Sequence, residues 1–471
     1  NYAHKHFAPR LQKNGARSLT RSKPYLPKRG MHLDLKGLPP TSKRLLQLPR
    51  MVKAMGYNCM LVEYNVMFPW SRKEFRNKTA YSEATISSFL EKAENNDIEI
   101  IPLAQSLGHL EIVGGLKKFA HLREIQNDPA ELCPTNPGSL KIVSGMVADV
   151  LKLHRGRIRH FHLGGDEAWN LGSCPRCRKF IARLGAQGRA LLFLRQIEPL
   201  LDQINAEGVR PILWADMMRE WPVAALRRLA GKTDLMEWGY GPNQFETGPQ
   251  NRTIPIFREA GIPLWGASAF KGGDGCTSDR PNIPNKIANN LGWARKAHAE
   301  RMKGVIATGW SKGDDFCAHS EGLESSLDSL AIAGAILWDG RAPKHPEQAA
   351  RAFLLKGALK TICGKRALSI IDAAISLKNW QQHFDPQIRW LLCQYPFNGE
   401  KGHFGFQRDI FLDWFDNYVK DGARRLAHWR KLYQGLAPEP WLEIYITNRL
   451  TPMRMFSEFF RSVCPPTKSL R

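Results

Sequence analysis

Residues 158–169 of this 471-residue chain read IRHFHLGGDEAW. The apolar positions of IRHFHL predict a short buried strand, and the two glycines after it allow a backbone or a ligand to approach closely. The strand gives way to a loop at two adjacent carboxylates, Asp166 and Glu167. Two neighbouring carboxylates resist ionising together, so one is a candidate proton donor near neutral pH, as in a glycosidase. The competing interpretation is a helix N-terminus, at which Asp166 caps the helix and Glu167 complements its dipole.

Similar segments precede and follow this one along the chain. The predicted strands span residues 31–35, 58–63, 98–103, 158–163, 211–214, 235–238, 262–265 and 305–308. Between most of them, apolar residues recur at three- and four-residue steps typical of amphipathic helices, as in 140–151, 191–204 and 288–297. Eight strands alternating with helices predict an α/β protein with a (β/α)8 TIM barrel.

The chain is long enough for this barrel and a smaller second unit. Further helical patterns cover residues 346–359, 368–383, 410–432 and 444–460. We therefore expect a basic N-terminal segment over 1–28, a catalytic barrel domain over 29–345 and a C-terminal helical domain over 346–471. The helical domain is expected to pack on the barrel or on a partner subunit, which makes a homodimer one hypothesis for the assembly.

Catalytic groups of such a barrel lie at the carboxyl ends of its strands. Side-chain alternation along 158–163 turns His160 and His162 toward the barrel interior, with Asp166, and turns Phe161 and Leu163 toward the helices. Polar and aromatic residues also follow the other predicted strands, namely His109 and Glu111 after the third, Trp214 and Asp216 at the fifth, Trp238 and Tyr240 at the sixth, and Trp310 and Asp314 after the eighth. Packing alone does not explain five such strand ends, so we predict an active site here.

The motif His162-x-Gly164-Gly165-Asp166-Glu167 resembles the catalytic signature of glycoside hydrolase family 20, the β-N-acetylhexosaminidases. Further matches resemble the hexosaminidase D-like subgroup and follow in order over residues 31–315. They are HLDLKGLPP at 32–40, EY and MFP within 63–69, PL and GHLE within 102–111, WGASAFKG at 265–272 and TGW at 308–310.

The resemblance implies an exo-acting enzyme that removes terminal GalNAc or GlcNAc with retention of configuration, in which the substrate's acetamido group acts as nucleophile and forms an oxazolinium ion. Glu167 would be the general acid and then the base. Asp166 would orient the acetamido N–H and stabilise the positive charge, and Tyr240 would hold the acetamido oxygen. None of these roles requires a metal or an organic cofactor.

The resemblance and the strand-end positions also suggest which residues bind the sugar. The predicted substrate-binding residues are His109, Trp214, Asp216, Trp238, Trp310, Asp314 and Asp34. Core packing is the alternative for the tryptophans. His109 instead forms a structural pair with Glu111 in one alternative, and Lys36 either contacts the sugar or makes a buried ion pair. After Trp310 the subgroup's Arg-Tyr-Asp-His pattern is replaced by KGDD at 312–315, which leaves the choice between GalNAc and GlcNAc open.

The formal net charge is +24, with lysines and arginines spread along the chain. No nucleic-acid-binding signature accompanies them, so we favour a solvated basic surface over attraction to an anionic polymer and predict no nucleic-acid partner. No apolar run is long enough to span a membrane. The expected partner is an amino-sugar glycan.

The nine cysteines are scattered, which is typical of reduced thiols and suggests a cytoplasmic location. Cys174 and Cys177 form the one tight pair, CPRC, and supply two of the four ligands that a structural zinc needs. Cys133 is a candidate third ligand if the loops meet. The alternatives are thiols that pack or that form a redox pair.

Two other functions fit the sequence. The first is a barrel that binds amino sugars without cleaving them. The second is a conventional two-carboxylate retaining glycosidase, with Glu167 as acid and Glu63, Glu111 or Asp216 as nucleophile.

Overall fold

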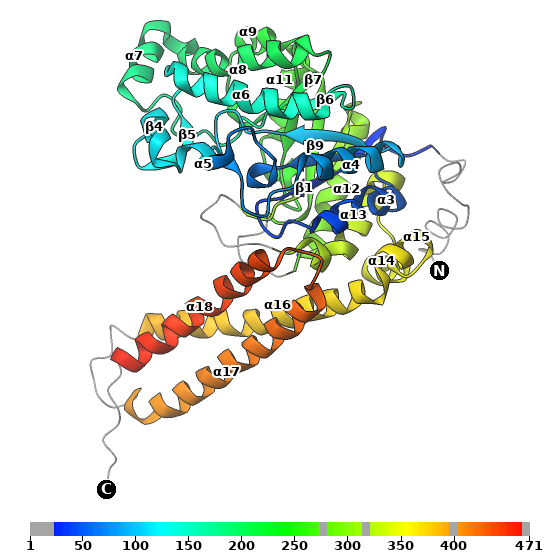
Figure 1. Ribbon diagram of the computed structural model, residues 1–471, viewed down its shortest axis with the longest axis vertical. Helices are drawn as coiled ribbons and strands as arrows, with labels where there is room; N and C mark the ends of the chain where they lie inside the picture. Colours follow the sequence, from blue (N-terminus) through cyan, green and yellow to red (C-terminus); the bar gives the residue numbers. More distant parts are fainter. Residues whose placement is uncertain (1–22, 274–279, 313–320, 395–403, 464–471) are drawn as a thin grey trace.

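The protein, seen in a computed structural model, is described over residues 23–273, 280–312, 321–394 and 404–463. Eight parallel strands close into a barrel in the order β1-β10-β9-β8-β7-β6-β3-β2 (Figure 1). The strands are β1 (Lys28–Asp34), β2 (Cys59–Glu63), β3 (Glu99–Leu103), β6 (His160–His162), β7 (Arg210–Trp214), β8 (Asp234–Trp238), β9 (Leu264–Lys271) and β10 (Gly304–Gly309). All eight predicted strands are present, and the predicted TIM barrel is confirmed.

Helices surround the barrel and connect its strands. They are α2 (Ser42–Leu45), α3 (Leu48–Ala54), α4 (Glu83–Glu94), α5 (Glu111–Gly114), α6 (Pro137–His154), α7 (Pro175–Leu184), α8 (Gly188–Ala206), α9 (Val223–Leu226), α10 (Gln244–Thr247), α11 (Gln250–Glu259), α12 (Ile283–Ala299) and α13 (Leu327–Asp339). The three apolar stripes predicted from the sequence lie on α6, α8 and α12. In the described part of the chain, no helix has the length and apolar character that a bilayer span requires.

The core has two layers, one inside the barrel and one between the barrel and the helices. Phe161 and Leu163 belong to the outer layer. His162 points inward and packs on Trp214, with ring centroids 4.4 Å apart, and His160 packs on Trp265 at 5.3 Å. The predicted alternation along β6 is therefore confirmed, and it aims the end of this strand at the barrel axis.

A small antiparallel hairpin interrupts the connection between β3 and α6. It consists of β4 (Arg123–Ile125) and β5 (Asp128–Leu132), which the sequence patterns did not predict. The hairpin packs on α5. Leu110, just before that helix begins, donates its backbone N–H to Ala130 O over 2.8 Å. Figure 1 shows β4, β5 and α5 gathered at one side of the barrel, near α7.

The C-terminal region is helical, as predicted. It contains α14 (Pro346–Leu354), α15 (Gly357–Ile362), α16 (Gly364–Gln394), α17 (Phe404–Tyr433) and α18 (Glu439–Val463). The pattern predicted as one helix over 346–359 is split between α14 and α15. The three long helices pack on one another and project away from the barrel (Figure 1).

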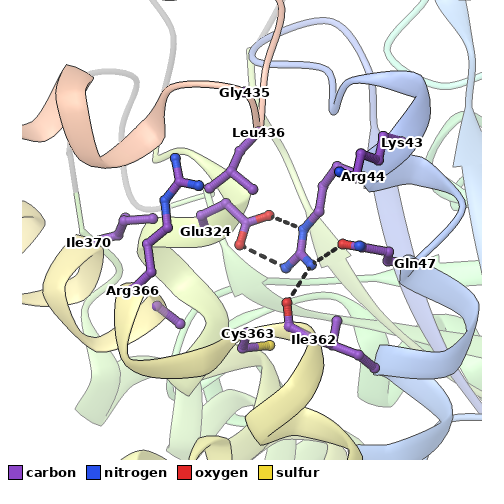
Figure 2. Close-up of a pocket in the computed structure, with 11 residues that line it drawn as sticks. Lys43, Arg44, Gln47, Glu324, Ile362, Cys363, Arg366, Ile370, Gly435 and Leu436 are labelled. Carbon is purple, nitrogen blue, oxygen red and sulfur yellow. Dashed lines mark hydrogen bonds and ion pairs between the residues drawn. The ribbon is translucent and has the colours of Figure 1, made fainter.

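A pocket of about 350 Å³ lies where α2 meets the helical region at α15 and α16 (Figure 2). Arg44 of α2 donates to both carboxylate oxygens of Glu324, over 2.7 and 2.9 Å, and also reaches Gln47 and the backbone oxygen of Ile362. These polar groups satisfy one another, which a buried ion pair requires. The pocket is thus a structural joint between the barrel and the helical region.

Candidate active site

The loop after β6 carries the two adjacent carboxylates. Gly164 and Gly165 have φ angles of +61° and +84°, and a Cβ atom on Gly164 would lie 1.8 Å from Gln105 Oε1. Glycine adopts such a conformation at little cost, and a side chain on Gly164 would have to displace that of Gln105. Asp166 and Glu167 follow in the loop, whereas α7 begins at Pro175. The interpretation of the pair as a helix N-terminus is therefore wrong, since Cys174 occupies the cap of α7.

His109, from the loop after β3, contacts both carboxylates. Its Nε2 lies 3.5 Å from Asp166 Oδ2 and 3.3 Å from Glu167 Oε2. The backbones of His109 and Glu167 both adopt left-handed conformations, with φ of +52° and +50°. Such conformations cost about 1–3 kcal/mol each and cluster at functional sites. A Cβ atom on Gly108 would lie 2.2 Å from Asp166 O, so the loop after β3 and the loop after β6 are in close backbone contact.

The two carboxylates differ in environment. The side chain of Asp166 is 9% exposed and that of Glu167 is 39% exposed. Burial raises the pKa of Asp166 to about 7, against the attraction of His109. Burial disfavours the imidazolium, but Asp166 and Glu167 raise the pKa of His109 to about 10. The two carboxylates thus favour the protonated form of His109, and burial favours the neutral form of Asp166.

Asp216, after β7, holds the loop of Asp166 and Glu167 from the other side. Its Oδ2 accepts a hydrogen bond from Glu167 N over 2.9 Å, and its Oδ1 accepts from Trp238 Nε1 over 3.1 Å. Burial raises the pKa of this carboxyl group. Because both oxygens are engaged, Asp216 orients Glu167 and Trp238.

Aromatic rings line the same end of the barrel. Tyr240 stacks on Trp238 with centroids 5.2 Å apart and meets Trp310 edge-on at 6.2 Å, and Trp310 lies 6.0 Å from Trp214. Burial, together with the carboxylates of Asp166 and Glu167, raises the pKa of Tyr240 well above its ordinary value. The phenol therefore remains a hydrogen-bond donor at neutral pH.

Several buried polar atoms at this end have no hydrogen-bond partner among the described residues. Asp166 Oδ1 and Trp214 Nε1 are among them. Buried polar groups are normally paired, so atoms of this kind at the end of a barrel fit contacts to a polar ligand.

The end of β1 carries a charged network. Lys36 Nζ lies 2.6 Å from Glu63 Oε1, so Lys36 makes the buried ion pair considered as one alternative. Burial opposes the charge on Glu63, but Lys36 and His32 hold its pKa well below the usual range. Asp34 is buried, and its carboxylate accepts from Lys36 N over 2.9 Å and from Ser311 N over 2.8 Å.

The structure therefore brings together nearly all of the predicted site residues. His109, Asp216 and the tryptophans surround Asp166, Glu167 and Tyr240, and Asp314 lies outside the described residues. The contact of His109 with both carboxylates was not predicted, because no spacing in the sequence relates residues 57 and 58 positions apart. In the described part of the chain, a cluster with metal-binding geometry occurs elsewhere, between the β4–β5 hairpin and α7.

A model of the glycosyl hydrolase family 20 catalytic domain matches residues 9–249. The chain belongs to glycosyl hydrolase family 20. Hexosaminidase D from Bos taurus is 32% identical over 346 residues, which are 71% of this chain and 99% of that protein. Hexosaminidase D from Homo sapiens is 33% identical over 321 residues, which are 66% of this chain and 65% of that protein. The predicted family and enzyme class, a hexosaminidase-type glycoside hydrolase, are confirmed.

Solved structures of the family share the fold. The β-N-acetylhexosaminidase of Bacteroides fragilis aligns with a TM-score of 0.53 at 14% identity, over 74% of this chain and 72% of that one. The Flavobacterium johnsoniae chitobiase aligns with a TM-score of 0.53 at 14% identity, over 93% of this chain and 73% of that one. At this identity the likeness supports the barrel architecture alone.

Proposed function

We propose that the protein is an exo-acting β-N-acetylhexosaminidase that removes terminal GalNAc or GlcNAc with retention of configuration, using the acetamido oxygen of the substrate as nucleophile. The observation that carries the proposal is the pair of adjacent carboxylates in unlike environments, both in contact with His109. The more exposed Glu167 suits proton exchange with a leaving group and with water. The buried Asp166 suits a partner that binds the acetamido group.

In the first step, protonated Glu167 donates its proton to the glycosidic oxygen. The acetamido carbonyl oxygen forms a bond to C1 as the bond from C1 to the leaving oxygen breaks, which yields the oxazolinium ion. Ionised Asp166 accepts a hydrogen bond from the acetamido N–H and balances the developing positive charge. Tyr240 donates a hydrogen bond from its hydroxyl to the acetamido oxygen.

In the second step, the Glu167 carboxylate removes a proton from water, and the water oxygen bonds to C1. The bond between C1 and the acetamido oxygen breaks, which restores the acetamido group and releases the sugar with its original configuration. Glu167 has regained its proton and is ready for another substrate.

The network around the site argues against Glu63 and Asp216 as conventional enzymic nucleophiles. Glu63 is paired with Lys36, and both carboxylate oxygens of Asp216 accept hydrogen bonds from Glu167 N and Trp238. A carboxylate held in this way is a poor nucleophile. The substrate's own carbonyl then fills that role.

The test is hydrolysis of aryl N-acetyl-β-galactosaminide and N-acetyl-β-glucosaminide by the parent, by Glu167→Gln and by Glu207→Gln. Glu207 is a surface residue whose exposed partner is Arg155, so its substitution is the matched control and should leave activity unchanged. We expect cleavage by the parent and the control, a loss of about 10²–10⁴-fold in Glu167→Gln, and no cleavage of aryl glycosides that lack the acetamido group.

Cleavage of sugars without an acetamido group would favour the two-carboxylate mechanism. Binding of GlcNAc or GalNAc without turnover by a folded parent would favour the sugar-binding barrel. The configuration of the first product, followed by NMR, separates retention from inversion.

A further inference from the structure

Three thiols and one carboxylate meet at the side of the barrel. Glu124 comes from β4, Cys133 follows directly after β5, and Cys174 and Cys177 lie at the start of α7. One donor atom from each of the four residues lies within 4.8 Å of the others, and three of the four residues are buried. We call this group the thiol cluster.

The distances within the thiol cluster are those of ligands around one centre. Cys133 Sγ lies 3.6 Å from Cys174 Sγ and 3.5 Å from Cys177 Sγ, and Cys177 Sγ lies 3.3 Å from Glu124 Oε2. A disulfide would need about 2.05 Å between sulfurs. Four ligands in a tetrahedron around zinc, with Zn–S of about 2.3 Å, place sulfurs about 3.8 Å apart. The observed distances are close to the edges of that tetrahedron.

We propose that Glu124, Cys133, Cys174 and Cys177 bind a structural zinc ion. Three sulfur donors favour zinc over the hard cations Mg²⁺ and Ca²⁺, which bind oxygen. Four protein ligands are the number that a closed structural site requires, whereas a catalytic site keeps one position open. The pair Cys174-x-x-Cys177 at the start of a helix supplies two ligands with the usual close spacing, and the β4–β5 hairpin supplies the other two.

The surroundings hold these ligands in place. Glu124 Oε1 accepts hydrogen bonds from Gly172 N and Cys174 N, over 3.1 and 2.9 Å, which leaves Oε2 turned toward the sulfurs. Cys177 N points at Cys174 Sγ over 3.4 Å, and an Arg176 guanidinium nitrogen lies 3.8 Å from Cys133 Sγ. Donors of this kind offset the negative charge of three thiolates and orient metal ligands.

A redox pair would account for less of this arrangement. A disulfide exchange site needs two thiols, whereas here a third thiol and a fixed carboxylate oxygen face the same point. Simple packing does not explain why Glu124 Oε2 faces a sulfur atom, since both backbone donors of this buried carboxylate bind the other oxygen, Oε1.

The zinc would tie together two loops that enter the carboxyl end of the barrel. The hairpin belongs to the segment that also carries His109, and the cysteines of α7 follow the loop that carries Glu167. A direct hydrogen bond already links these segments, because Asn170 N donates to Glu131 Oε1 over 2.8 Å. The site would act as a clamp between them. This inference does not depend on the proposed function.

The first experiment measures the metal content of the full chain, purified without chelator, by inductively coupled plasma mass spectrometry. We expect about one zinc per chain in the parent and in Cys363→Ser, the matched control, because Cys363 is a half-buried free thiol of the α15–α16 junction. We expect at least a tenfold lower zinc content in Cys133→Ser and in Cys177→Ser. A folded parent that contains no zinc after incubation with zinc would overturn the proposal, as would a disulfide found by mass spectrometry between any two of the cluster cysteines.

The second experiment does not require that the cysteine variants fold. The parent is stripped with a chelator and loaded with Co²⁺, whose visible absorption is intense in tetrahedral sites and shows charge-transfer bands when thiolates are bound. We expect both signatures, and we expect Glu124→Cys to retain the metal with stronger charge-transfer bands from a fourth thiolate. The weak spectrum of octahedral cobalt would overturn the assignment of the ligands. A Co²⁺ spectrum of Glu124→Cys that is identical to the parent's would overturn it as well.

Discussion

The same two loops build two clusters of titratable side chains that differ in access. Asp166 and Glu167 meet His109 where the barrel opens, and the Glu167 side chain is 39% exposed. The thiol cluster of Glu124, Cys133, Cys174 and Cys177 lies farther along the same segments, and its groups face one another. In one cluster a buried carboxylate oxygen of Asp166 has no partner among the described residues, whereas in the other every donor atom is turned to a common point.

This difference fits the two proposals, in which the first site exchanges ligands and the second keeps one. A catalytic centre must leave polar atoms available to the substrate, and strained backbone such as that of His109 and Glu167 is tolerated there because the surroundings enforce it. A structural metal site gains stability by satisfying all its ligands. If the comparison holds, substitutions in the first cluster abolish turnover without loosening the protein. Substitutions in the second loosen the protein first and lower turnover only by displacing the loops that carry His109 and Glu167.

After Glu167→Gln, the largest effect is expected for Asp166→Asn. Loss of the charge that stabilises the oxazolinium ion should lower kcat by about 10²–10³-fold, the cost typical of removing one group that stabilises a transition state. The variant should keep the parent's zinc content and thermal unfolding temperature. Steady-state kinetics and metal analysis of the same sample check this, and an equal loss of zinc would show that the two clusters are not separable.

Removal of zinc from the parent is expected to have the next largest effect. Chelation should lower the unfolding temperature and reduce kcat by about 10–100-fold, since a displacement of about 1 Å in reacting groups can cost about 10²-fold. Addition of zinc should restore both quantities. Cys363→Ser should respond as the parent does. Full activity in protein shown to be free of metal would mean that the clamp does not position the catalytic loops.

The pH dependence of kcat/KM tests the charge of His109. In the proposed mechanism Asp166 must be ionised, so activity should rise as the pH increases through its pKa of about 7. His109 favours the ionised form, so His109→Asn should raise this pKa and move the acid limb to higher pH by about 1–3 units. The exposed His121 provides the control His121→Asn. A limb that moves to lower pH in His109→Asn would contradict the assigned interaction.

The fold could be predicted from the sequence because barrel strands and amphipathic helices repeat a local pattern. Every predicted strand overlaps an observed one, and only their ends differ. The β4–β5 hairpin was missed because its strands, Arg123–Ile125 and Asp128–Leu132, are short and polar. Its stability comes from pairing and from contact with α5, which no local pattern records.

The positions of candidate site residues were predictable where these residues lie at or shortly after a strand end. Trp238 ends β8, Asp216 lies two residues after β7, and Asp166 lies four residues after β6. Contacts between loops were not predictable in the same way. Glu124 has no spacing relation to Cys174, and it joins the thiol cluster only because the missed hairpin folds back onto α7.

The smallest effect is expected for Asp34→Asn, at the end of β1. The Asp34 carboxylate accepts from Lys36 N and Ser311 N, and an amide nitrogen would face one of these donors instead. Leaving a buried donor unpaired costs about 1–3 kcal/mol, and the affected segment follows Trp310. We therefore expect a modest loss of stability and a fall in kcat/KM of about tenfold, mostly through KM. The matched control is Asp149→Asn on the outer helix α6, where the Asp149 carboxylate accepts a similar hydrogen bond from Ser71 N.

The same variant decides between positioning and direct sugar contact at Asp34. If Asp34 acts through Ser311 and Trp310, the loss should be the same for the full sugar and for deoxy analogues that lack one hydroxyl. If Asp34 binds a hydroxyl directly, the loss should disappear for the analogue without that hydroxyl, because no contact remains to be broken. Both carboxylate oxygens already accept backbone hydrogen bonds, over 2.9 and 2.8 Å, which favours the first outcome.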